Sequence, residues 1–408
     1  IYVMLSALIA AAFSLLFAYK KGLPVSTTHA MIGGVVGSSI VLGISLGGTD
    51  MALSTVDWGT IGTIAISWVI SPVLGGVFSY LLYGQIKKKI IEYNDRTEAH
   101  IATLKDDKKT VKQNHKEYLE SLTESEQLAY TSAMLRDQEI YKDDDCDIED
   151  LETDYYKQLY KIEHERSNLD TLKALKQWVP LIAGAGGAVM TSLVVFKGLK
   201  NVNSNMTTLQ GFFIMGMIAA LVWLATFIYT KSIRGKHKED LTKATFIMFS
   251  WMQVFTASAF AFSHGSNDIA NAVGPFAAIM DVIRTNSIAT EAAVPPAVML
   301  TFGVALIVGL WFIGKEVIQT VGTNLAKMHP ASGFSAELAA AAVVMGASTM
   351  GLPVSSTHTL VGAVLGIGIV NRDTNWALMK PIGLAWVITL PAAASMSAIS
   401  YLLLSNIF

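Results

Sequence analysis

The stretch Gly22-Leu23-Pro24-Val25-Ser26-Thr27-Thr28-His29 recurs far along the chain as Gly351-Leu352-Pro353-Val354-Ser355-Ser356-Thr357-His358. Extending both copies to 19 residues keeps 11 of the 19 positions identical. A second pair follows in the same order, because Trp68-Val69-Ile70-Ser71 corresponds to Trp386-Val387-Ile388-Thr389. Chance similarity is a poor explanation for two blocks that recur in the same order in both halves. The sequence therefore predicts a duplicated fold.

The composition indicates a membrane protein with one large hydrophilic loop. Of the 408 residues, 52% are hydrophobic and only 15% are charged, whereas a soluble domain carries about a quarter charged residues. Residues 86–176 hold 16 Lys or Arg and 22 Asp or Glu, which is 38 of the 62 charged residues. The net charge of -2 provides no basic surface, so we expect no nucleic-acid partner.

Apolar runs long enough to cross a bilayer recur along the chain. We expect membrane spans at 2–18, 59–84, 178–196, 210–230, 244–263, 294–314, 334–350 and 381–405. Three shorter apolar pieces follow breaks that contain Gly or Pro, at 27–46, 269–283 and 357–370. We expect these pieces to be half-helices or re-entrant segments, which lie at membrane depth only where protein or a wet cavity surrounds them. The predicted fold class is an all-α polytopic membrane protein with broken or re-entrant helices.

Basic residues set the expected orientation in the membrane. Lys87-Lys88-Lys89 follow one span, Lys173 and Lys176 precede the next, and further basic residues lie in 231–243. By the positive-inside rule both connections are cytoplasmic. We therefore expect a multi-pass protein of the plasma membrane with the 86–176 loop in the cytoplasm. This loop has no Gly or Pro, so we expect helices in it, and a simple connector is favoured over a regulatory domain.

The duplication also predicts the domain organisation. We expect the remainder of a first transmembrane repeat at 1–85, the hydrophilic loop at 86–176, two intervening helices at 177–243 and a second repeat at 244–408. The offset between the copies places Ile1 opposite Pro330. We therefore expect about 86 further residues upstream of Ile1. An odd number of spans per copy would make the repeats inverted, an architecture that secondary transporters use.

The duplicated motif has the chemistry of an anion site. Pro24 and Pro353 break the preceding helix, and Ser and Thr residues follow where the next helix begins. The first-turn N–H groups of a helix lack intrahelical partners, and the helix dipole adds partial positive charge there. Hydroxyls and free amides together bind anions without Arg or Lys. Two such sites predict a tetrahedral oxyanion between the repeats, whereas each copy alone is equally compatible with an ordinary N-cap.

A second segment, Ser263–Ala272, places an acidic residue in an apolar run. Asp268 is the only acidic residue between positions 240 and 281, and an ionisable group inside a membrane span is costly and usually functional. We expect Gly265 to let the helix bend here. The alternative is a capped helix break with a locally satisfied Asp. The oxygen ligands that we expect around a small cation belong to Ser266, Asn267, Asp268 and Asn271.

Three histidines accompany these groups, namely His29, His264 and His358. We expect them to orient neighbouring hydroxyls or satisfy the helix breaks, and proton transfer is the less favoured role. A membrane phosphatase would require a nucleophile with a base or a metal cluster. No acidic residue stands beside either Ser/Thr-His motif in the sequence, so we do not expect an enzyme or a resident cofactor.

These motifs resemble those of the inorganic phosphate transporter family, often called PiT, which includes sodium–phosphate symporters. Residues 265–272 match its Gly-Ala-Asn-Asp-x-Ala-Asn-Ala motif, with Ser266 where Ala is common, and residues 22–29 and 351–358 match its Gly-x-Pro-x-Ser-x-x-His motif. The first-half Asn-Asp motif of the family is absent from these 408 residues. The resemblance implies that phosphate is held by Ser26, Thr27, Thr28, Ser355, Ser356 and Thr357, and sodium partly by Asn267 and Asp268.

The resemblance implies a secondary active transporter that imports inorganic phosphate, coupled to sodium, by alternating access. Hydroxyls and helix termini do not distinguish oxyanions, so a proton-coupled phosphate permease or a sulfate permease is the alternative. A membrane phosphate receptor with the loop as its output is a third, less favoured one. The expected partners are phosphate, sodium or protons, and the lipid bilayer. The sequence leaves the oligomeric state open, with a homo-oligomer as one option.

Overall fold

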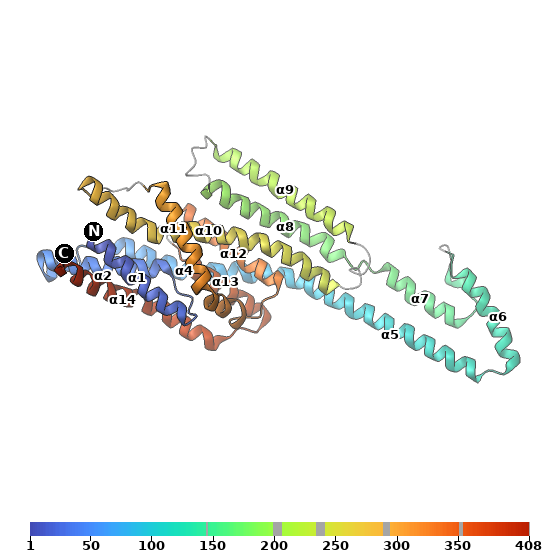
Figure 1. The fold of residues 1–408 in the computed structure, drawn as a ribbon. Coiled ribbons are helices and arrows are strands. Elements are labelled where there is room, and N and C mark those ends of the chain that lie inside the picture. Colours follow the sequence, from blue (N-terminus) through green and yellow to red (C-terminus); the bar gives the residue numbers. More distant parts are fainter. Residues whose placement is uncertain (144–145, 199–205, 234–240, 289–293, 351–353, 408) are drawn as a thin grey trace. The chain divides into compact units, whose positions relative to one another are not determined.

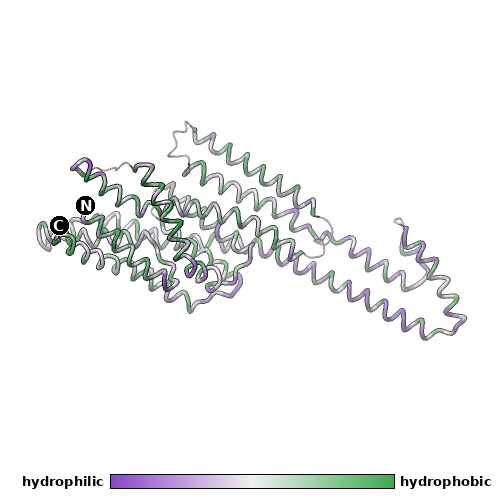
Figure 2. The backbone as a smooth tube through the Cα atoms, in the orientation of Figure 1, coloured by the Kyte–Doolittle hydropathy of each residue, from purple (hydrophilic) through white to green (hydrophobic). Residues whose placement is uncertain are grey.

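The computed structural model describes residues 1–143, 146–198, 206–233, 241–288, 294–350 and 354–407. All regular secondary structure in these ranges is helical (Figure 1), which confirms the all-α fold class. Nine helical segments in the described ranges are long and apolar enough to cross a membrane. Figure 2 shows the hydropathy changing along the chain, with green apolar stretches in the spans and purple hydrophilic stretches in the loop helices.

The helices follow the predicted spans closely. The first part contains α1 (Tyr2–Lys20), α2 (Thr27–Gly47), α3 (Thr49–Ala52) and α4 (Trp58–Ile86). A π-helical turn, η1 (Lys87–Ile91), leads into the loop helices α5 (Glu92–Ser121), α6 (Glu124–Ile140), η2 (Ile148–Asp150) and α7 (Asp154–Asn168). The remaining helices are α8 (Lys173–Leu193), η3 (Val194–Gly198), α9 (Thr208–Ser232), α10 (Leu241–Thr285), α11 (Pro296–Gln319), η6 (Thr320–Asn324), α12 (Pro330–Thr349), α13 (Ser356–Asn371) and α14 (Trp376–Ile407).

One of the three expected half-helices is wrong, and a second is longer than expected. The segment 27–46 forms α2, whose 21 residues are long enough to cross a membrane. The segment 269–283 belongs to α10, a continuous helix of 45 residues that runs through Gly265 without a break. Glycine permits a bend but does not impose one, and the intrahelical hydrogen bonds are kept. Only 357–370 remains short, as α13 has 16 residues.

The chain divides into two compact units. The first comprises residues 1–86, 182–223 and 246–408, and the second comprises 87–181 and 224–245. The first unit therefore holds both copies of the duplicated motif and most of α10. Within it, α2 packs against α1 and α14, and α13 packs against α4 and α12.

Corresponding positions of the two copies make corresponding contacts in the first unit. Gly33 on α2 lies against the Leu390 carbonyl of α14, and its counterpart Gly362 on α13 lies against the Pro72 carbonyl of α4. A Cβ atom at either glycine would overlap the facing carbonyl oxygen. Each glycine thus lets its helix approach a helix of the other copy closely. The inverted orientation of the repeats stays a prediction.

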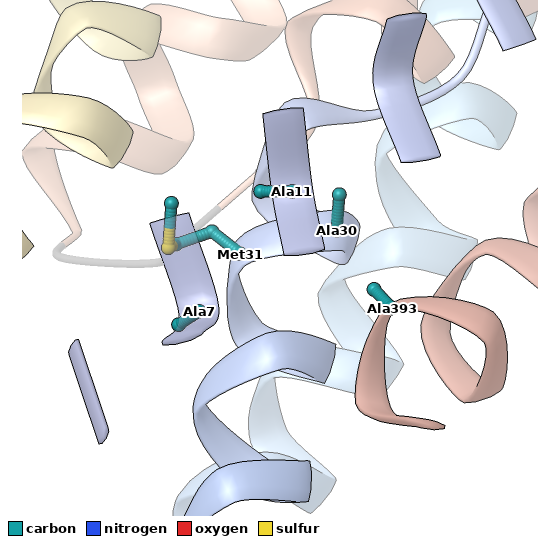
Figure 3. Close-up of a cluster of buried hydrophobic side chains, with 5 residues drawn as sticks. All are labelled: Ala7, Ala11, Ala30, Met31 and Ala393. Carbon is teal, nitrogen blue, oxygen red and sulfur yellow. The ribbon is translucent and has the colours of Figure 1, made fainter. Parts of the chain in front are cut away.

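A buried apolar cluster of four alanines and one methionine also joins α1, α2 and α14. Ala7 and Ala11 of α1, Ala30 and Met31 of α2, and Ala393 of α14 gather there (Figure 3). Small side chains allow close helix packing in a membrane, where van der Waals contact replaces the hydrophobic effect as the driving force between helices. This packing holds the beginning of α2, which carries half of the candidate site.

The second unit contains the helices predicted for the hydrophilic loop. In it α5 packs against α7. The buried Asp137 of α6 accepts hydrogen bonds of 2.8 Å from the N–H groups of Glu152 and Thr153. Glu98 of α5 accepts hydrogen bonds from the N–H and the hydroxyl of Thr242, at 2.7 and 2.8 Å. Because Thr242 is the second residue of α10, Glu98 satisfies an N–H group that the helix leaves free.

Candidate functional site

The first motif begins with a sharp end to α1. Gly22 adopts a φ of +68°, its N–H bonds to the Tyr19 carbonyl at 2.9 Å, and the N–H of Leu23 bonds to the Ala18 carbonyl at 3.0 Å. These two bonds form a Schellman motif, in which glycine is favoured because the left-handed conformation strains a side chain. The chain therefore turns before Pro24, and the hydroxyl residues reach the beginning of α2.

Both motifs start a helix with a serine N-cap. The Ser26 hydroxyl accepts a hydrogen bond from the N–H of His29 at 3.3 Å, and the Ser355 hydroxyl accepts one from the N–H of His358 at 3.2 Å. The ordinary capping role is thus present at both serines. Their part in holding an anion stays a prediction.

The carboxylate of Asp268 links the two helix beginnings. Thr27 of α2 donates its hydroxyl to Asp268 Oδ2 at 2.9 Å, and Ser356 of α13 donates its hydroxyl to Asp268 Oδ1 at 3.2 Å. Asp268 lies on α10 and is 9% exposed. The carboxylate that contacts both motifs thus comes from a helix that is far from them in the sequence.

The two asparagines of α10 join the same hydrogen-bond network through their amide nitrogens. Asn267 Nδ2 donates to Asp268 Oδ1 at 3.2 Å. Asn271 Nδ2 donates to the hydroxyl oxygens of Thr27 and Thr28, at 3.1 and 3.2 Å. The amide oxygens of the two asparagines take no part in these hydrogen bonds. The oxygen is the amide atom that would bind a cation. The network therefore places hydroxyls, a carboxylate and amide oxygens within one small volume.

His264 completes the network on the α10 side. Its Nδ1 atom lies 2.6 Å from the Ser356 hydroxyl oxygen, and its Nε2 atom lies 3.6 Å from Asp268 Oδ2. The His264 side chain is 38% exposed, whereas that of Asp268 is 7% exposed. His264 thus orients a neighbouring hydroxyl, one of the two roles expected for the histidines.

The structure brings most of the predicted site residues together. Thr27, Thr28, Ser356, Asn267, Asp268 and Asn271 share the network above. Thr357 is half-buried in the first turn of α13. The side chain of Ser266 and residues 351–353 lie outside the described part of the structure.

One membrane carboxylate was missed by the sequence analysis. Glu337, on α12, accepts a hydrogen bond of 2.7 Å from the hydroxyl of Thr256 on α10. The sequence pattern does single out Glu337, because it is the one ionisable residue within the apolar run 330–349. The same argument had identified Asp268.

Comparisons with known proteins agree with this architecture. A family model described as "Phosphate transporter family" matches residues 1–397. A protein of Mycobacterium bovis named as a phosphate permease is 56% identical over 406 residues, covering 100% of this chain and 73% of its own length. A protein of Pyrococcus furiosus, also named as a phosphate permease, is 28% identical and covers 98% of this chain and 76% of its own length.

A solved structure described as the sodium-dependent phosphate transporter is also similar. Its TM-score is 0.69 at 26% identity, covering 100% of this chain and 80% of that chain. The fold and the matching family are those of transporters rather than enzymes, which confirms the resemblance drawn from the motifs. With its apolar helices, the chain is a multi-pass protein of the cell membrane.

Proposed function

Since this chain belongs to the phosphate transporter family, we propose that it imports inorganic phosphate together with sodium by alternating access. One observation carries the proposal. The Asp268 carboxylate contacts the hydroxyls at the beginnings of both α2 and α13. These hydroxyls, with the first-turn N–H groups, are the donors that would hold phosphate.

The position of Asp268 supplies a physical reason for coupling. A phosphate ion held by these hydroxyls would lie close to the Asp268 carboxylate, and the two negative charges would repel. The repulsion is strong in a buried, weakly screened site. A sodium ion bound by Asp268 and the oxygens of Asn267 and Asn271 neutralises the carboxylate. The hydroxyls of Thr27 and Ser356 are then released from the carboxylate and donate to phosphate instead. Each ligand favours the binding of the other.

Alternating access follows if the two ligands stabilise the inward-facing and outward-facing states differently from the empty protein. In duplicated transporters the substrate lies at the interface of the repeats. Thr27 and Ser356 come from the two copies of the motif, so a ligand between them would be held by both. Rearrangement of one copy against the other would open this site to either side.

Proton coupling is the second candidate, and His264 is the observation that favours it. This histidine contacts both Ser356 and Asp268, so a proton on its ring would take the place of sodium beside the carboxylate. Sulfate remains the alternative anion, because hydroxyls and helix termini suit either oxyanion.

The test is uptake of labelled phosphate into proteoliposomes that contain the protein. A sodium gradient and a proton gradient are imposed separately, with excess sulfate as competitor. We expect uptake that is driven by sodium and resists sulfate. Uptake driven only by protons would show that protons, and not sodium, are the coupling ion. Uptake abolished by sulfate would show that the site does not select phosphate.

A further inference from the structure

Four aromatic rings from both copies form a continuous row of ring contacts in the first unit. The ring centroids of Trp68 and His29 are 3.6 Å apart, those of His29 and His358 are 4.4 Å apart, and those of His358 and Trp386 are 3.9 Å apart. The two histidines meet edge to face, with their planes at 88°. We call these four residues the ring column.

The ring column is symmetric with respect to the duplication. His29 and His358 hold the same position in the two motifs, and Trp68 and Trp386 hold the same position in the second repeated block. The contact between the histidines is therefore one of the places where the two copies meet, in addition to the close approaches at Gly33 and Gly362. Each copy contributes one helix beginning, on α2 or α13, and one supporting tryptophan, on α4 or α14.

The two histidines contact each other through their rings and not through a hydrogen bond. Neither ring nitrogen of His358 makes a hydrogen bond among the described residues, and the His29 ring has a polar interaction only with the backbone of Trp386, although the two histidines are 1% and 4% exposed. Stacked and edge-to-face aromatic pairs contribute about 0.5–1.5 kcal/mol beyond the area that they bury. The rings thus act by packing.

Each histidine is also tied to the first turn of its own helix. Its backbone N–H donates to the N-cap serine, Ser26 or Ser355. The hydroxyl residues lie between that serine and the histidine, so a shift of the ring moves the whole turn. Trp386 adds a further tie, because its Nε1 donates to the Pro24 carbonyl at 2.9 Å.

We propose that the ring column is a clasp that fixes the distance between the first turns of α2 and α13, and with it the geometry of the phosphate site. His29 and His358 are positioning residues, because they act through the neighbouring hydroxyls. The inference rests on the proposed function for its effect on phosphate. Its structural part, the fixed distance, is independent of transport.

The clasp has a distinctive kinetic signature. His29→Ala and His358→Ala should each raise the KM for phosphate by about tenfold, which corresponds to about 1.4 kcal/mol. The KM for sodium should change less, since Asp268 and the asparagines lie on α10. Because losing either ring opens the clasp, the double variant should resemble the single variants. A double variant with the product of the two single effects would contradict the clasp.

Two further variants separate positioning from general damage. His29→Phe restores a ring without nitrogens and should bring the KM for phosphate back towards the wild-type value. Phe334→Ala is the matched control, because this buried ring pairs with Phe249 at 5.9 Å and makes no ring contact with the ring column. It should lower thermal stability and leave the KM unchanged. A His29→Phe variant as defective as His29→Ala would show that the imidazole nitrogens are required, and would overturn the proposal.

Amide hydrogen exchange tests the clasp without phosphate. His29→Ala should speed exchange in the first turns of both α2 and α13, whereas His29→Phe and Phe334→Ala should not. If the wild-type protein takes up no phosphate and this exchange pattern appears, the clasp stands while the proposed function fails. Unchanged exchange at α13 in His29→Ala would overturn the clasp, whatever the uptake.

Discussion

Thr27 donates a hydrogen bond of 2.9 Å to Asp268, although 241 positions separate the two residues in the sequence. This bond joins the beginning of α2 to the middle of α10. Asp268 also accepts from Ser356 through its other oxygen, so one carboxylate holds a hydroxyl from each copy of the motif. The proposed coupling of cation and anion depends on this shared group.

Removing the charge of Asp268 tests its role directly. Asp268→Asn keeps the shape of the side chain and an oxygen that accepts from Thr27, so we expect a folded protein. Sodium-stimulated phosphate uptake should be abolished, because an amide neither attracts sodium as a carboxylate does nor needs neutralising. The measurement is initial uptake into proteoliposomes against sodium concentration. Wild-type sodium dependence in this variant would remove Asp268 from the cation site.

Two threonines should differ in the ligand that they affect. Thr357→Val removes a hydroxyl from the first turn of α13 and should weaken phosphate affinity more than sodium affinity. Thr27→Val also removes a donor to Asp268 and should therefore change both affinities. A lost hydrogen bond to a charged group costs about 1.5–3 kcal/mol. Equal losses for both ligands in Thr357→Val, measured by titration calorimetry, would indicate structural damage.

Glu98 caps the beginning of α10 and should therefore contribute to stability. Glu98→Ala should lower the free energy of unfolding by about 0.5–2 kcal/mol, as for the loss of other N-caps. Thermal unfolding of the purified protein measures this change. The matched control is Glu120→Ala, because Glu120 is exposed and forms only a long ion pair of 3.9 Å with Lys116 Nζ. An equal effect of the two substitutions would contradict a capping role.

Deletion within the loop distinguishes a connector from a regulator. Removing residues 106–165 keeps Asn94, which donates to the Thr245 hydroxyl at 2.7 Å, and also keeps Glu98. If the distal helices only connect the two halves, some phosphate uptake should remain. Complete loss of uptake in a well-folded deletion variant would instead indicate regulation or assembly.

Asp137 should make the second unit sensitive to acid. Burial raises the pKa of its carboxyl, but the hydrogen bonds from Glu152 and Thr153 outweigh this effect and hold the pKa below its ordinary value of 3.8. A carboxyl group with a lowered pKa stabilises the fold at pH values above its ordinary pKa. This stability is lost as the pH falls through the folded-state pKa. Asp137→Asn should be less stable near neutral pH and lose less stability on acidification. Thermal unfolding from pH 7 to pH 3 compares the two proteins, and parallel curves would contradict this role.

Periodic and local signals in the sequence were sufficient for most helices. Apolar length marked the spans, and the Gly22–Pro24 break was visible because glycine and proline have few alternatives in such a turn. The continuous course of α10 through Gly265 was not predictable in the same way. A glycine within a helix is compatible with a bend or with its absence, and packing decides between them.

The candidate site was only partly accessible from sequence. The duplicated hydroxyls and Asp268 were each identified by local chemistry. Their direct contact depends on where α10 passes relative to α2 and α13, and no local pattern encodes this. The ring column was missed for the same reason, because His29 and His358 are far apart in the sequence and meet only in the folded protein.

The phosphate affinity of the wild-type protein with and without sodium tests the proposed coupling through Asp268. Titration calorimetry gives the dissociation constant for phosphate at zero and at saturating sodium, with potassium keeping the ionic strength constant. We expect sodium to tighten phosphate binding by roughly 5–150-fold, and phosphate to tighten sodium binding by the same factor. A phosphate affinity that is the same with and without sodium would contradict the coupling through Asp268.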